Sequence, residues 1–242
     1  MEYKILNQDN STFPAKYYQF DLIYADMVYE NDSLEWTSLF WHGLKENGIF
    51  IVQTDWHTNY LVRNRFETKG LWGKINPVFV NHCVQKCEWG NHPKNKFHQA
   101  YDDILIFAKG NDWKFYSERV QVPKVTNNKG LNPSGRETKQ ATAWIDDICL
   151  TTTAKERIKK DDGHLIKWQK PLRLFDRIVA PFCNENDWVF DPFGGVFSLG
   201  EWCILNNRNY FGIEYAEESF GLGKQRLEKV YKSTISSSKE NK

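Results

Sequence analysis

The chain has 242 residues, of which 40% are hydrophobic, so it is long enough to bury one sizeable core, alone or with a small appended module. Its net charge is +1 and its isoelectric point about 7.6, which excludes a strongly basic protein and limits any nucleic-acid contact to a local patch. No apolar run approaches the roughly 20 residues of a membrane helix, the first residues do not form a secretory signal, and five cysteines without framework spacing favour a reducing cytoplasm.

The first 110 residues alternate strand-like and helix-like segments. Short apolar runs such as FDLIYA predict buried strands, and apolar residues at helical spacing predict helices between them. This alternation predicts a mostly parallel α/β sheet that is covered by helices on both faces. The expected strands are residues 20–25, 48–53, 77–86 and 103–108, and the expected helices are 36–44 and 59–66.

The middle of the chain is its basic part. Residues 111–140 are polar, rich in Asn, Gly, Lys and Pro, and carry six Lys or Arg against three acids. Such a long segment without clear elements is either functional or disordered. Basic side chains continue through 151–170, so several phosphates could be neutralised here, although a solvated surface with interspersed acids explains the same composition.

After Pro171 the α/β pattern returns, and residues 232–242, rich in Ser and Lys, predict a disordered tail. The expected helices here are 172–180, 198–206 and 217–230, and the expected strands are 187–190 and 210–213.

A glycine turn in this last part carries the strongest local signal. The sequence DPFGG at 191–195 follows a predicted strand, and Glu214 ends the next one about 20 residues later. Glycines let backbone amides approach a ligand closely, and an acid at that distance suits the ribose hydroxyls of a nucleoside cofactor. A plain strand–helix–strand unit with a solvated glutamate is the other interpretation.

The wider pattern resembles the amino-methyltransferases of DNA that act on adenine N6 or cytosine N4. DPFGG is similar to the cofactor turn of that family, and WQKP at 168–171 resembles the element one helix before it. FDLIYADMVY at 20–29 resembles the strand that ends in the catalytic Asp-Pro-Pro-Tyr, and ILNQD at 5–9 is similar to the segment that contacts the cofactor adenine. The catalytic strand precedes the cofactor turn, which is the permuted, beta-group order. The resemblance covers residues 3–230.

The resemblance implies a Rossmann-like α/β methyltransferase fold with a central, mostly parallel, seven-stranded sheet. It divides the chain into a catalytic half (1–110), a small basic target-recognition insert (111–142), a cofactor-binding half (143–231) and the tail. The implied cofactor is S-adenosylmethionine, and the implied substrate is DNA with a base flipped into the pocket. The small insert favours a short target, a homodimer or a helper subunit, and no membrane association is expected.

Site residues are carried over from the matching motifs. Asp26 would accept an N–H bond from the exocyclic amine, the Met27 carbonyl would take the second N–H, and Tyr29 would stack on the base. Asp26 favours adenine, because cytosine-directed members often carry Ser there. The implied cofactor-binding residues are Asp9, Gln169, Lys170, Asp191, Phe193, Gly195 and Glu214.

This sequence departs from the family motifs at two positions of the proposed site. Met27 and Val28 replace two prolines, which leaves the catalytic loop less preorganised. Phe197 replaces a glycine after the cofactor turn, which either restricts the pocket or sends the loop along another path. Two alternatives therefore stay open, namely an RNA or free-base methyltransferase and a catalytically inactive binding or regulatory subunit.

Two other groups of residues have simpler interpretations. Cys83, Cys87, His92 and His98 match no standard zinc spacing, so no metal site is predicted. Lys94 and Lys96 are candidates for phosphate contacts, although a solvated loop explains them as well.

Overall fold

The structure is a computed structural model, and it describes residues 1–28, 33–87, 93–124, 135–149, 155–160, 162–166 and 168–240. Within these residues the strands form one eight-stranded sheet in the order β1-β10-β9-β2-β3-β5-β4-β8, with β6 and β7 paired separately. The strands of the large sheet are β1 (Tyr3–Asn7), β2 (Phe20–Asp26), β3 (Leu44–Thr54), β4 (Val78–Lys86), β5 (Tyr101–Ala108), β8 (Trp144–Ile145), β9 (Trp188–Asp191) and β10 (Asn209–Glu214).

Parallel pairing joins β1, β10, β9, β2 and β3, so the carboxyl ends of these five strands meet at one edge of the sheet. β5 runs antiparallel to β3, which brings its first residues to the same edge, where Asp103 pairs with Thr54. This edge therefore collects side chains from segments far apart in the sequence.

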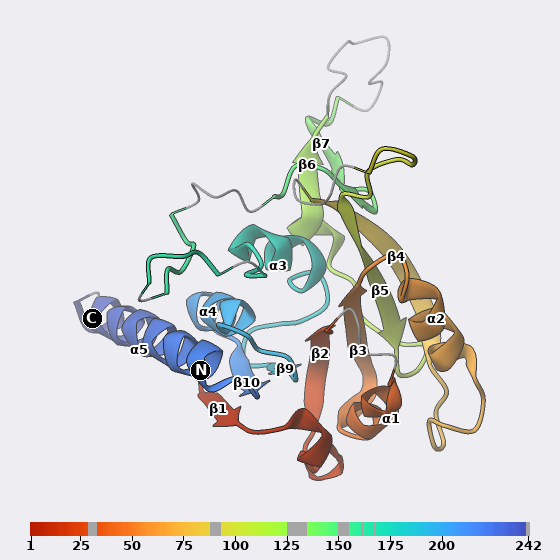
Figure 1. Cartoon of the computed structure of the whole chain (residues 1–242), viewed down its shortest axis with the longest axis horizontal. Coiled ribbons are helices and arrows are strands. Elements are labelled where there is room, and N and C mark those ends of the chain that lie inside the picture. Colours follow the sequence, from red (N-terminus) through yellow and green to blue (C-terminus); the bar gives the residue numbers. More distant parts are fainter. Residues whose placement is uncertain are drawn as a thin grey trace.

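Helices cover both faces of the sheet, as Figure 1 shows. Side chains alternate between the faces along each strand. Leu22 and Tyr24 of β2 belong to one apolar cluster, and Ile23 and Ala25 belong to the other. The first cluster packs against α3 (Leu172–Ile178), α4 (Ser198–Leu205) and α5 (Glu217–Glu240), and the second against α1 (Glu35–Trp41) and α2 (Asn59–Glu67).

The predicted α/β fold is confirmed, but the described sheet has eight strands instead of seven. The additional strand, β8, consists of two residues that pair in parallel with Val84 and Gln85 of β4. Ile145 of β8 is buried, so its packing stabilises this short edge strand.

The sequence predicts a disordered tail from residue 232, whereas α5 continues as a helix to Glu240, and residues 241 and 242 lie outside the described residues. The hydroxyl groups of Ser233, Thr234 and Ser236 donate hydrogen bonds to carbonyl groups three or four residues earlier. These polar side chains therefore satisfy their hydrogen-bonding groups within the helix.

The basic middle segment contains a small hairpin that lies at one end of the molecule (Figure 1). A short 3-10 helix, η3 (Ser117–Val120), leads into β6 (Gln121–Pro123), which pairs antiparallel with β7 (Thr138–Gln140). Two more 3-10 turns, η1 (Asn10–Thr12) and η2 (Ala15–Tyr17), connect β1 to β2.

Candidate active site

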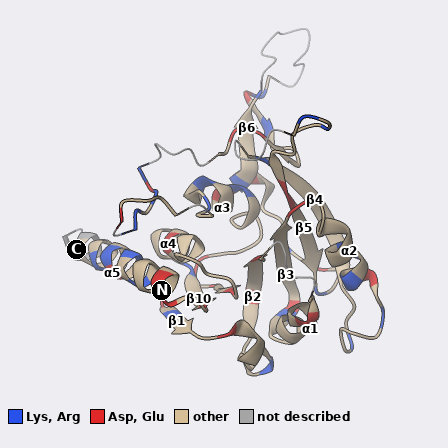
Figure 2. Ribbon diagram, viewed as in Figure 1, with Lys and Arg blue, Asp and Glu red and all other residues tan. Residues whose placement is uncertain are grey.

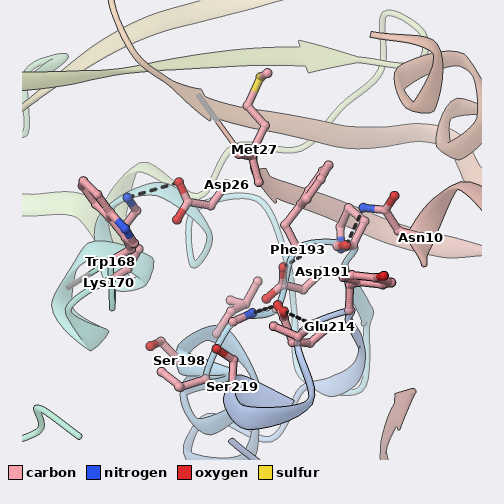
Figure 3. Close-up of a pocket in the computed structure, with 18 of the residues that line it drawn as sticks. Asn10, Asp26, Met27, Trp168, Lys170, Asp191, Phe193, Ser198, Glu214 and Ser219 are labelled. Atoms are coloured by element: carbon pink, nitrogen blue, oxygen red, sulfur yellow. Dashed lines mark hydrogen bonds and ion pairs between the residues drawn. The ribbon is translucent and has the colours of Figure 1, made fainter. Parts of the chain in front are cut away.

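A cavity of about 710 Å³ lies at the carboxyl edge of the parallel strands. Its walls are the residues after β1, the end of β2, the turn from β9 to α4, the end of β10 and the segment before α3 (Figure 3). Asp26 and Asp191 both line it, although 164 positions separate them in the chain, because β2 and β9 are adjacent parallel strands.

Asp26 is the last residue of β2, and its carboxylate faces a lysine. The Lys170 ammonium lies 3.1 Å from Asp26 Oδ1 and 3.3 Å from the carboxylate of Asp102 on β5. Burial raises the pKa of Asp26 to about 6, although Lys170 acts in the opposite direction. Asp26 is therefore mostly ionised at neutral pH and available as a hydrogen-bond acceptor.

A buried polar network extends from this ion pair across the sheet. The side-chain amide of Gln53 on β3 donates hydrogen bonds to Asp102 (2.8 Å) and to Gln85 on β4 (3.0 Å). The Tyr24 hydroxyl donates to the Gln53 oxygen at 2.6 Å. Sequence reasoning missed Gln53 and Asp102, since only strand pairing brings the end of β3 and the start of β5 beside Asp26.

Asp191 ends β9 and is almost completely buried. It accepts hydrogen bonds from the Tyr210 hydroxyl (3.0 Å) and from the Phe193 N–H (3.3 Å). These bonds favour the charged form, but burial dominates and raises the pKa of Asp191 to about 8. The carboxyl group is therefore mostly protonated at neutral pH, and a cation in the cavity would favour its ionisation.

Glu214 closes the glycine turn against the end of β10. Its two carboxylate oxygens accept hydrogen bonds from the Gly195 N–H and the Ala216 N–H, each at 2.7 Å. Burial is the main cause that raises the pKa of Glu214. Each oxygen retains a further lone pair, so the carboxylate can also accept hydrogen bonds from a ligand in the cavity.

The side chain of Phe197, which replaces the family's glycine, does not fill the cavity. Phe197 adopts the left-handed backbone conformation that favours glycine, with φ 53°, and its ring is buried. The ring packs edge-on against Tyr210 and Phe220. It occupies space that Gly194 and Gly223 leave, since a Cβ on either glycine would lie within 2.6 Å of a ring atom. The loop thus keeps a glycine-like path while the side chain joins the core.

The structure places nine of the ten predicted site residues in the wall of this one cavity, and Tyr29 lies outside the described residues. The nine are Asp9, Asp26, Met27, Gln169, Lys170, Asp191, Phe193, Gly195 and Glu214.

Three of these residues have their own structural contacts. Asp9 caps η1 by accepting the Ser11 N–H at 2.8 Å. The Gln169 amide is bound to the backbone on both sides, donating to the Glu156 carbonyl and accepting the Ile158 N–H. The Met27 N–H donates to the Gln53 carbonyl at 3.3 Å, which extends the β2–β3 pairing past Asp26.

Sequence reasoning also missed Asn10 beside the cavity. Its side-chain amide donates to the carbonyl of Pro192 in the cofactor-like turn at 2.9 Å and so ties the segment after β1 to that turn. No signal in the sequence connects these two residues, which are distant along the chain.

Among the described residues, no group of three or more His, Cys, Asp or Glu side chains is placed to hold a metal ion. His92 lies outside the described residues. None of the helices in the described part of the chain combines the length and apolar character that crossing a bilayer requires.

The fold is that of methyltransferases of the Rossmann-like class. The chain superimposes on M1.HpyAVI in complex with SAM with a TM-score of 0.65 and 22% identity, covering 93% of this chain and 100% of the other. The cytosine-N4-specific PvuII DNA methyltransferase gives a TM-score of 0.62 at 12% identity, covering 98% and 93% of the two chains. At these identities the likeness establishes the fold alone.

The chain belongs to the DNA methylase family of N6 and N4 amino-methyltransferases, whose family model matches residues 3–225. The type II methyltransferase M.HpaI of Haemophilus parainfluenzae is 26% identical over 206 residues, which is 82% of this chain and 59% of the relative. The DNA adenine methyltransferase YhdJ of Escherichia coli K12 is 40% identical over 149 residues, which is 57% and 48% of the two chains. The chain thus spans about half the length of these relatives.

Proposed function

We propose that this protein transfers a methyl group from S-adenosylmethionine to an exocyclic amino group of a DNA base, with adenine N6 as the favoured acceptor. The observation that carries the proposal is the single cavity shared by Asp26 on one side and by Asp191 and Glu214 on the other. A methyl donor and an amine acceptor have to meet in one site for a direct transfer.

The residues of the cavity fit the cofactor. The cavity volume of about 710 Å³ lies in the range of sites for ligands of this size. Glu214 offers carboxylate oxygens to ribose hydroxyls, and Asp191, mostly protonated in the cofactor-free protein, would ionise beside a ligand that carries positive charge. A Cβ at Gly195 would meet no protein atom within 4 Å, so the turn leaves open space where a ligand can approach the backbone.

The chain's own residues then act on the amine. The Asp26 carboxylate accepts one N–H, which favours a more tetrahedral nitrogen whose lone pair is less delocalised into the ring, and the Met27 carbonyl takes the second N–H. The cofactor supplies an electrophilic methyl carbon on a sulfonium. The sulfonium sulfur would leave as a neutral thioether, and the nitrogen would release one proton to solvent once it carries the methyl group. Catalysis of this kind rests mainly on positioning.

Three observations support DNA as the substrate and adenine as the base. The relatives include a protein named as a DNA adenine methyltransferase. An aspartate occupies position 26, where cytosine-directed members often have Ser. Exposed Lys and Arg residues on the β6–β7 hairpin and on the 93–100 loop lie at one end of the molecule (Figure 2), and we propose that the 111–142 insert, which contains this hairpin, contacts the target.

Labelled methyl transfer tests the proposal directly. The protein is incubated with methyl-labelled S-adenosylmethionine in three separate reactions. Each reaction contains one acceptor: genomic DNA from a methylation-deficient bacterium, total RNA or free adenine. We expect label in DNA, recovered as N6-methyladenine after hydrolysis to nucleosides. Label in N4-methylcytosine would change the base assignment, and label only in RNA or free adenine would replace the substrate. Failure to bind the cofactor in calorimetry would overturn the function itself.

A further inference from the structure

Trp168 is an exposed aromatic residue in the wall of the cavity. Trp168 is 71% exposed, whereas Trp41, Trp72 and Trp202 are buried in the core. A large indole that remains in water gives up the burial that normally stabilises tryptophan, so its exposure at a cavity points to a ligand contact. In the family-like element WQKP it is the residue directly before Gln169 and Lys170.

The neighbours of Trp168 hold its backbone in place. The Gln169 amide is fixed by hydrogen bonds to the backbone at Glu156 and Ile158, and it is buried. Lys170 is anchored to Asp26 and Asp102. The indole is therefore presented from a segment with two consecutive anchors rather than from a loosely held loop.

The position of Trp168 relative to the reacting groups suggests what it contacts. Figure 3 shows Trp168 beside Lys170, on the side of Asp26 away from Asp191 and Glu214. The cofactor-binding acids thus lie on one side of the catalytic carboxylate and the indole on the other. An amine that hydrogen-bonds to Asp26 is attached to a flat aromatic ring, and a flat indole is the side chain that matches such a ring by stacking.

We infer that Trp168 is a stacking surface for the flipped nucleobase and so a substrate-binding residue. This inference rests on the proposed function and adds a residue to the base side of the same cavity. Base–aromatic stacking of this kind tolerates any base, because every base has a π face. Trp168 therefore contributes affinity for the extruded base and leaves the choice between adenine and cytosine to hydrogen-bonding groups.

The test compares Trp168→Ala, Trp168→Phe and the matched control Trp144→Ala. Trp144 on β8 is also exposed, at 54%, but does not line the cavity. We expect Trp168→Ala to lower kcat/KM for genomic DNA by about tenfold, the scale of one lost base stack, with cofactor Kd unchanged within about twofold. Trp168→Phe keeps a flat ring and should retain most activity, and Trp144→Ala should behave as wild type. An increase in cofactor Kd in Trp168→Ala without an effect on DNA would overturn the inference and place the indole at the cofactor.

A second readout does not need turnover. An oligo(dA) 20-mer is titrated into each protein with S-adenosylhomocysteine present, and tryptophan fluorescence is followed. Stacking should quench the wild type and Trp144→Phe, while Trp168→Phe should lose that component. Equal quenching in Trp168→Phe and wild type would overturn the inference. If the wild type transfers no methyl group, the proposed function fails, and the quenching still decides whether a base reaches Trp168.

Discussion

The Lys170 ammonium lies 3.1 Å from the Asp26 carboxylate, and these two residues come from motifs far apart in the chain. The resemblance implied that Lys170 contacts the cofactor, whereas its described contacts are to the proposed catalytic acid and to Asp102. The ion pair links the segment before α3 to the end of β2. It therefore makes the ionisation of Asp26 dependent on a residue that no local sequence pattern connects to it.

Asp26→Ala is expected to reduce methyl transfer roughly 100-fold or more, because the amine loses a positioned hydrogen-bond acceptor. Cofactor affinity in calorimetry should remain within about twofold of wild type. Asp26→Asn retains an acceptor oxygen and should retain part of the activity. Full activity in Asp26→Ala would show that β2 is not the catalytic strand.

Glu214→Ala should weaken binding of S-adenosylmethionine by about 10- to 100-fold, the scale of hydrogen bonds to a charged acceptor. Glu214→Gln retains one acceptor oxygen and should lose less. Because Glu214 also accepts the Gly195 N–H, thermal unfolding of both variants is measured alongside the titration. Unchanged affinity in a folded Glu214→Ala protein would exclude the ribose-binding role.

Lys170→Met should raise the pKa of Asp26 above its value of about 6, since the lysine stabilises the carboxylate. Activity that needs ionised Asp26 rises as the pH passes that pKa, so the acidic limb of the pH–rate profile should move to higher pH. Single-turnover transfer across pH 5–9 measures this shift, and carbon-13 NMR of the Asp26 carboxyl reports the pKa directly. The exposed Lys16→Met is the control, and an unmoved limb in Lys170→Met would contradict the assignment.

Asp191→Asn should stabilise the cofactor-free protein at pH 8 more than at pH 5. Between the ordinary aspartate pKa near 4 and the folded value of about 8, the unfolded chain is ionised while folded Asp191 holds its proton. Folding then takes up a proton, so the stability of the wild type falls as the pH rises through this window. The stability of Asp191→Asn lacks this pH dependence, because asparagine does not ionise. Thermal unfolding of wild type and Asp191→Asn at pH 5 and pH 8 checks the direction of this difference in stability. The same variant should bind the positively charged cofactor less tightly.

Phe197→Ala should lower the free energy of unfolding by about 3–5 kcal/mol, as expected for loss of a buried phenyl ring. Alanine leaves the left-handed backbone conformation just as unfavourable, so the change reports packing against Tyr210 and Phe220. Phe97→Ala removes the same ring from a site that is 94% exposed and should change stability little. Urea unfolding measures the free energy of unfolding of both variants. Equal losses of stability in the two variants would refute the packing argument.

Much of the fold followed from local pattern. The apolar run at 20–25 and the helix-spaced residues at 59–66 correspond to β2 and α2 within one or two residues. The register of the strands was not available from local pattern, so the contribution of β1 and of β8 to the sheet emerged only in three dimensions. The continuation of α5 past residue 231 was missed because a Ser-rich composition is not typical of a helix. Short edge strands depend on pairing partners, and a Ser-rich helix end depends on side-chain bonds to its own backbone.

The sequence by itself determined the motifs, their order and the chemical types at the site, since a glycine turn, a strand-end acid and a second acid are properties of local residues. Only the tertiary structure decided that Asp26 and Asp191 face one cavity and that the Phe197 ring enters the core. It also decided that Asp26 and Asp102 anchor Lys170, with Gln53 donating a hydrogen bond to Asp102. The physical reason is that parallel pairing of β2 with β9 and the choice of side-chain direction are set by contacts between residues far apart in the chain, which local pattern does not contain.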